Sequence, residues 1–142
     1  MAARESEPRD VVRMIRSLVA TARSFGPAWR GLCLALRTQR NVRVHAAATV
    51  LVVVAGCWLG MAAWEWCVVA LATGLVWTAE LLNTAIEALA DRVSGAREEP
   101  IRRVKDLAAS AVLASAVTAA AVGAGVFLPK IWRLFENVPA VP

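Results

Sequence analysis

The chain has 142 residues, 58% of them hydrophobic, and a mean hydropathy of +0.55. Soluble globular domains have an apolar share of about 45–50%, so this composition argues against an ordinary water-soluble domain. The formal net charge is +5, and nine of the 16 basic residues precede His45. We expect a single all-α integral membrane domain across residues 1–142.

Residues 1–44 are expected to form cytoplasmic surface helices. Between residues 9 and 25, apolar side chains recur at helical spacing on one face and arginines on another, which is typical of a helix that lies on a membrane surface. A solvated helix that packs on its own protein is the alternative. Gly26-Pro27 is expected to break this helix. A second amphipathic run over residues 28–43 leads into the first spanning helix.

Three long apolar stretches follow, at residues 45–64, 66–92 and 105–128, and residues 129–142 form a tail. Each stretch is close to the ~20 residues that an α-helix needs to cross the hydrocarbon core. We therefore predict three transmembrane helices. A water-soluble bundle is the alternative, but it would need polar faces that these stretches almost lack.

The distribution of basic residues predicts the orientation of these helices. The first connection has none, whereas the second contains Arg92, Arg97, Arg102, Arg103 and Lys105. The positive-inside rule then places the N-terminus and the second connection in the cytoplasm, with the C-terminus outside. Arginines would also suit nucleic acid, but no recognition motif accompanies them, so we expect no nucleic-acid partner.

The cytoplasmic end of the second stretch carries an acidic stripe. Glu80, Asn83, Glu87 and Asp91 fall within one sector of a helix. Carboxylates close to lipid are costly and normally mark a functional site. Two structural alternatives stay open. Asn83 would also serve as an interhelical hydrogen-bond partner, and Glu87 or Asp91 would also form ion pairs with nearby basic residues.

These residues match the needs of phosphoryl transfer. That reaction needs a metal ion to neutralise phosphates, a cation at the transferred group and a base or positioner for the attacking hydroxyl. Glu80 is deep enough to meet a lipid hydroxyl, and Glu87 is nearer to water, where it could hold a metal ion. Lys105 and Asp106 begin the third stretch at a similar depth. Neither GxxxxGKS/T nor GxGxxG occurs, so charged side chains and metal would handle any phosphate.

A non-enzymatic membrane oligomer is a competing hypothesis. Ion-conducting assemblies and scaffolds also carry carboxylates inside the membrane. Lys105 and Asp106 beside the acidic stripe, together with the basic cytoplasmic rim, favour a nucleotide site because a simple conduit does not need them.

Three segments together resemble a known family. The run AELLNTAIEALADRV, the later KDLAASAVL and the earlier AWRGLCLALRTQRNVRVH are similar to the signature of prokaryotic membrane diacylglycerol kinases and undecaprenol kinases. The resemblance covers about residues 25–128. It implies a homotrimer in the bacterial cytoplasmic membrane, with active sites between subunits, that transfers the γ-phosphoryl group of Mg-ATP to a lipid hydroxyl.

The resemblance also implies roles for individual residues. Glu80 matches the catalytic base and Glu87 a Mg²⁺ ligand. Nucleotide-site roles fall on Asn83, Asp91, Lys105 and Asp106. Weaker candidates are Arg23 for phosphate and Trp29 and Arg43 for lipid.

One departure from the family concerns the metal site. The family's second metal-binding carboxylate aligns with Gln39, whose neutral amide oxygen is a weaker ligand for Mg²⁺ than a carboxylate. The segment TQRNVRVH is more similar to undecaprenol kinases of the TERN-x-R-x-H type than to the best-known enterobacterial diacylglycerol kinases. We therefore expect undecaprenol as the substrate, with diacylglycerol as the alternative.

Overall fold

The computed structural model describes residues 7–93 and 98–136, and in residues 7–24 it describes the backbone but few side chains. These residues form four helices: α1 (Glu7–Thr38), α2 (Arg40–Trp58), α3 (Ala63–Val93) and α4 (Glu99–Glu136). The prediction of an all-α chain is confirmed. The chain divides into two units, with α1 in the first and α2, α3 and α4 in the second.

The break expected at Gly26-Pro27 is wrong, because α1 continues through Pro27. Proline already has a helical φ angle, and inside a helix it removes one backbone hydrogen bond and crowds one carbonyl. The flanking turns tolerate that loss here. The chain instead leaves the helical conformation at Gln39, whose φ of −100° and ψ of 124° are extended.

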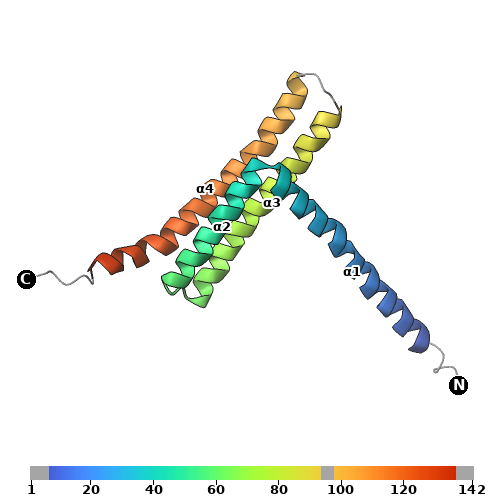
Figure 1. Cartoon of the computed structure of the whole chain (residues 1–142), viewed down its shortest axis with the longest axis horizontal. Helices are drawn as coiled ribbons and strands as arrows, with labels where there is room; N and C mark the ends of the chain where they lie inside the picture. Colours follow the sequence, from blue (N-terminus) through green and yellow to red (C-terminus); the bar gives the residue numbers. More distant parts are fainter. Residues whose placement is uncertain (1–6, 94–97, 137–142) are drawn as a thin grey trace, which may run out of the picture. The chain divides into compact units, whose positions relative to one another are not determined.

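Helices α2, α3 and α4 lie side by side, as Figure 1 shows. All three are long and apolar enough to cross a membrane, in agreement with the three predicted spans. Their ends differ from the prediction. Helix α2 begins at Arg40, and α4 extends the predicted 105–128 in both directions, through Pro129 into the expected tail. An apolar run in the sequence marks only the part of a helix that lies inside lipid. It therefore does not predict the charged turns at the ends of the helix.

The turn between α2 and α3 is tightly packed. Gly60 has a φ of +62°, a left-handed conformation that suits glycine. The Met61 amide donates to the Gly56 carbonyl over 3.1 Å, and the Ala62 amide donates to Glu65 Oε2 over 2.6 Å. Lys130 Nζ on α4 lies 2.9 Å from the same Glu65 oxygen. These contacts join all three helices at this end of the bundle.

Candidate active site

The predicted stripe lies along one side of α3, and its exposure rises toward the C-terminal end of the helix. Glu80 and Asn83 are buried, at 2% and 5% exposure, whereas Glu87 is half-buried and Asp91 is exposed. A single helix thus carries a series of polar groups from the interior of the bundle to its end. This is the arrangement expected for a site that takes one reactant from lipid and the other from water.

Glu80 is the deepest member of the stripe. Its Oε2 atom is buried and accepts no hydrogen bond from any described residue. The nearest cationic or potentially cationic group is the His45 ring on α2, whose Nε2 lies 3.9 Å from Glu80 Oε2. A buried carboxylate oxygen without a donor is costly. Such a group is typical of a functional site rather than of a core that serves only packing.

Asn83 and Glu87 form a pair on successive turns of α3. Asn83 Nδ2 donates to Glu87 Oε1 over 3.0 Å. Asn83 Oδ1 is buried and has no partner among the described residues. Asn83 therefore orients the Glu87 carboxylate while its own oxygen stays available, so two oxygen-bearing groups lie together below the end of the helix.

Asp91 and Lys105 connect the end of α3 to the beginning of α4. Lys105 Nζ lies 2.6 Å from Asp91 Oδ1, and Lys105 also interacts electrostatically with Glu87. The structure thus brings together predicted residues from two helices. Asp91 therefore forms an ion pair, as one of the structural alternatives allowed, and its partner is Lys105.

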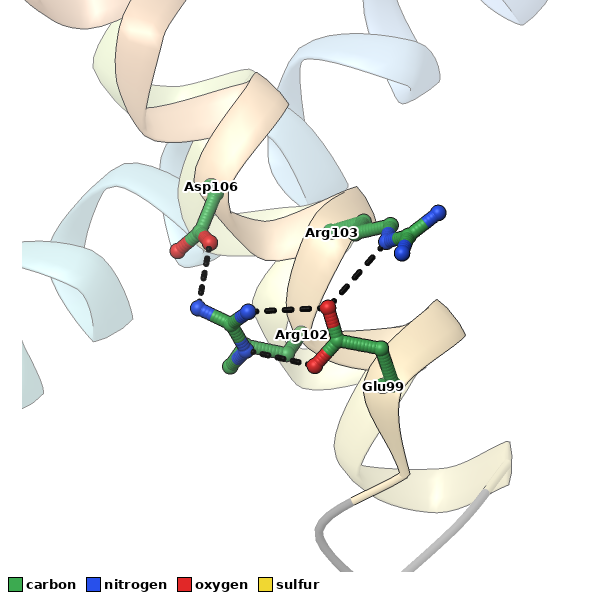
Figure 2. Close-up of polar contacts among 4 residues, drawn as sticks. All are labelled: Glu99, Arg102, Arg103 and Asp106. Atoms are coloured by element: carbon green, nitrogen blue, oxygen red, sulfur yellow. Dashed lines mark hydrogen bonds and ion pairs between the residues drawn. The ribbon is translucent and has the colours of Figure 1, made fainter.

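Asp106 belongs to a second charged cluster on the first turns of α4, shown in Figure 2. Arg102 donates to both Glu99 oxygens, over 3.0 and 2.8 Å, and to Asp106 Oδ2 over 3.4 Å. Arg103 Nε donates to Glu99 Oε1 over 3.2 Å. These bonds hold the pKa of Glu99 below its usual value, and those from Arg102 contribute more than the bond from Arg103. The cluster precedes the apolar part of α4 and holds Asp106 on the same end of the bundle as Asp91.

The described residues fit a magnesium ion only as part of a larger complex. No three His, Cys, Asp or Glu side chains within residues 7–93 and 98–136 gather closely enough to hold a metal ion. Mg²⁺ usually binds through one or two carboxylates together with substrate phosphates. Glu87 and the unpartnered Asn83 oxygen suit that mode. Gln39 is half-buried at the N-cap of α2, and its side chain makes no capping hydrogen bond.

The remaining predicted residues, Arg23, Trp29 and Arg43, lie on α1 and α2. The side chain of Arg23 lies outside the described residues. Trp29 is 68% exposed on α1, and it lines a shallow apolar groove of that helix with Phe25 and Leu32. Arg43 is exposed on α2.

Sequence reasoning did not identify the second polar feature, which lies where α2 packs on α3. Trp77 Nε1 donates to Thr49 Oγ1 over 3.0 Å, and Thr49 Oγ1 donates to the His45 carbonyl over 2.8 Å. His45, Thr49 and Trp77 line an apolar cavity of ≈ 360 Å³ between α2, α3 and α4. One signal in the sequence could have indicated the contact between His45 and Glu80. The first two apolar stretches are joined by a short turn and so form an antiparallel hairpin. Both residues lie far from that turn, and therefore at similar depth.

Comparison with known proteins assigns this architecture to a family. A family model described as prokaryotic diacylglycerol kinase matches residues 26–127. Among similar proteins, an undecaprenol kinase of Bacillus subtilis is 38% identical over 109 residues, which are 77% of this chain and 89% of that protein. A diacylglycerol kinase of Synechocystis is 40% identical over 112 residues, covering 78% of this chain and 64% of that protein.

A third relative is more distant. A diacylglycerol kinase of Escherichia coli K12 is 34% identical over 97 residues, which are 68% of this chain and 80% of that protein. The family model covers the end of α1, all of α2 and α3, and α4 as far as residue 127.

Proposed function

The chain belongs to the family of prokaryotic diacylglycerol kinases, and we propose that it is a membrane lipid kinase that transfers the γ-phosphoryl group of ATP to undecaprenol. One structural observation supports this function above the others. The buried Glu80 carboxylate has an unpartnered oxygen and shares one side of α3 with Asn83 and Glu87.

In the proposed reaction, Glu80 is the general base. The lipid hydroxyl gives its proton to Glu80 while the hydroxyl oxygen forms a bond to the γ-phosphorus. The bond between that phosphorus and the bridging oxygen of ADP breaks, and ADP leaves with the electron pair. Glu80 suits this role because its carboxylate is buried at the deep end of the stripe and one of its oxygens has no hydrogen-bond donor among the described residues.

The polar groups nearer the end of α3 are proposed to bind Mg-ATP. Glu87, oriented by Asn83, would hold the Mg²⁺, with Gln39 as a neutral second ligand. The ion would neutralise phosphate charge. Lys105 is proposed to contact the phosphates, with Asp91 and Asp106 positioning the nucleotide. Arg23 is a further phosphate-binding candidate.

The choice of lipid rests on sequence similarity near the start of α2. The TQRNVRVH segment favours undecaprenol, and the Bacillus relative named undecaprenol kinase matches over most of its own length. Diacylglycerol is the alternative, because two of the relatives are named diacylglycerol kinase. Trp29 and Arg43 are proposed to contact the lipid.

We propose the bacterial cytoplasmic membrane as the location, with the N-terminus and the α3–α4 connection inside. The support is the basic residues on these segments. Helix α1 is then a surface helix, and its exposed Phe25 and Trp29 would enter the lipid interface. Three copies are proposed to assemble, each completing a neighbour's site, as the family resemblance implies.

The test is phosphoryl transfer by the purified protein. With Mg-ATP labelled in the γ-position, wild type should label undecaprenol in mixed micelles, and diacylglycerol is assayed in parallel. Glu80→Gln should abolish transfer while Mg-ATP still raises the thermal midpoint of the variant, because only the base is lost. A wild type that transfers to neither lipid and gains no stability from millimolar Mg-ATP would favour a non-enzymatic membrane oligomer.

A further inference from the structure

We propose that His45 is a positioning residue for Glu80, an inference that rests on the proposed lipid kinase function. In this arrangement the imidazole Nε2–H donates to Glu80 Oε2. The carboxylate is then held with its other oxygen turned toward the lipid hydroxyl. His45 acts through Glu80 and does not need to touch the substrate.

The contact between the two side chains supports this role. Nε2 and Oε2 are 3.9 Å apart, and the side chains are 22% and 3% exposed. That separation is longer than a hydrogen bond, but catalytic contacts commonly tighten only when substrate binds. Oε2 has no other hydrogen-bond partner among the described residues. The imidazole is therefore the group placed to satisfy an oxygen that burial has removed from water.

The backbone that carries His45 is itself fixed against α3. Trp77 donates to the Thr49 hydroxyl, and that hydroxyl donates to the His45 carbonyl one turn earlier. Trp77 precedes Glu80 by one turn of the same helix. His45 thus faces Glu80, and Thr49, one turn later on α2, bonds to Trp77, one turn earlier on α3. This is the pairing expected of two antiparallel helices. This packing sets the position of the imidazole ring along the helix axis relative to Glu80.

The proposed step balances without a further reactant. The lipid O–H proton passes to the other Glu80 oxygen, Oε1, the lipid oxygen bonds to the γ-phosphorus, and the phosphorus–oxygen bond to ADP breaks. His45 keeps its proton throughout. Its contribution is orientation of the base, so its loss should lower the rate of the chemical step without weakening nucleotide binding.

Three variants of His45 test the inference. Glutamine places an amide nitrogen close to the position of Nε2, asparagine places it near Nδ1 instead, and leucine removes the donor. His45→Leu and His45→Asn should lower kcat at least about tenfold, in the range of a lost catalytic orientation. The KM for Mg-ATP and the thermal shift with Mg-ATP should stay near wild type. His45→Gln should keep kcat within roughly threefold of wild type.

The pair of amide variants carries the test even if His45→Leu fails to fold, because both amides are polar and small. Equal kcat values for His45→Gln and His45→Asn would overturn the inference, as would wild-type kcat in a folded His45→Leu. A wild type that phosphorylates no lipid contradicts the proposed function itself. An active wild type with an active His45→Asn contradicts the positioning role alone.

Discussion

Lys105 Nζ lies 2.6 Å from Asp91 Oδ1, so an ion pair joins the beginning of α4 to the end of α3. Both side chains retain solvent contact, at 35% and 66% exposure. Exposed ion pairs contribute little to stability. The proposal that Lys105 serves a ligand rather than folding can therefore be tested by separating the two effects.

Replacing Lys105 with methionine should impair ATP use far more than folding. Loss of a cation that contacts phosphate should lower kcat/KM for ATP roughly 10–100-fold. Thermal unfolding in detergent should hardly change, since the pair is exposed. Steady-state kinetics with varied Mg-ATP and a thermal melt of the same preparation measure both effects.

An exchange of charges provides the control for that prediction. The double variant Asp91→Lys with Lys105→Asp restores an ion pair between the helices but moves the cation from α4 to α3. It should remain as inactive as Lys105→Met. Recovery of activity would mean that the residues serve only to connect the helices, and Lys105 would then leave the nucleotide site.

The metal requirement should depend on Gln39. A carboxylate binds Mg²⁺ more strongly than an amide oxygen, so Gln39→Glu should lower the Mg²⁺ concentration that gives half-maximal activity. Arg40→Met is the matched control, because it changes the charge of the adjacent residue by the same amount without adding an oxygen ligand. A magnesium titration at fixed ATP compares the variants. An equal shift in both would assign the effect to charge, and no shift in Gln39→Glu would remove position 39 from the metal site.

The sequence predicted the site best where its geometry is local. Glu80, Asn83, Glu87 and Asp91 share one side of α3 because the helical repeat alone dictates it. The contact between Asp91 and Lys105 needed the packing of α3 on α4, and sequence gave only their similar depth. The His45–Glu80 contact was missed for the same reason, since two separate helices must be in register to form it.

Helix boundaries show a second limit of the sequence. Apolar length predicted the three spans, because the hydrocarbon core requires it. It could not predict that α1 continues through Pro27, or that α4 continues through Pro129. A proline costs a helix one hydrogen bond and some crowding, and whether the helix continues depends on packing and solvation of the turns around it.

The ion pair at the other end of the bundle should matter for stability and not for catalysis. Glu65 Oε2 accepts from the Ala62 amide over 2.6 Å and lies 2.9 Å from Lys130 Nζ. Lys130→Met leaves a poorly exposed carboxylate without its cation, so it should lower the thermal midpoint in detergent. Activity below the melting range should stay near wild type.

A second substitution separates charge from packing at this end. In the double variant Glu65→Gln with Lys130→Met, the unpaired charge is gone, while a side-chain oxygen still faces the Ala62 amide. The thermal midpoint should recover toward wild type. If the double variant is less stable than Lys130→Met, the loss comes from packing of the lysine stem and not from the stranded carboxylate.

Gly56 should be the position of α2 that least tolerates a methyl group. A Cβ built there would lie 2.6 Å from Met61 Sδ and 2.7 Å from a Trp66 ring carbon. The methionine can move, but the indole is stiff and packs against the core formed by Met61, Val69 and Val126. Gly56→Ala should therefore lower the free energy of unfolding by about 1–3 kcal/mol, the usual cost of overpacking.

Gly74→Ala on α3 is the control, because a Cβ there meets no atom of the chain within 4 Å, and alanine favours a helix by about 1 kcal/mol over glycine. Thermal melts of the two variants in one detergent should shift in opposite directions, and a Gly56→Ala protein as stable as wild type would show that the α2–α3 turn is more loosely packed than the structure indicates.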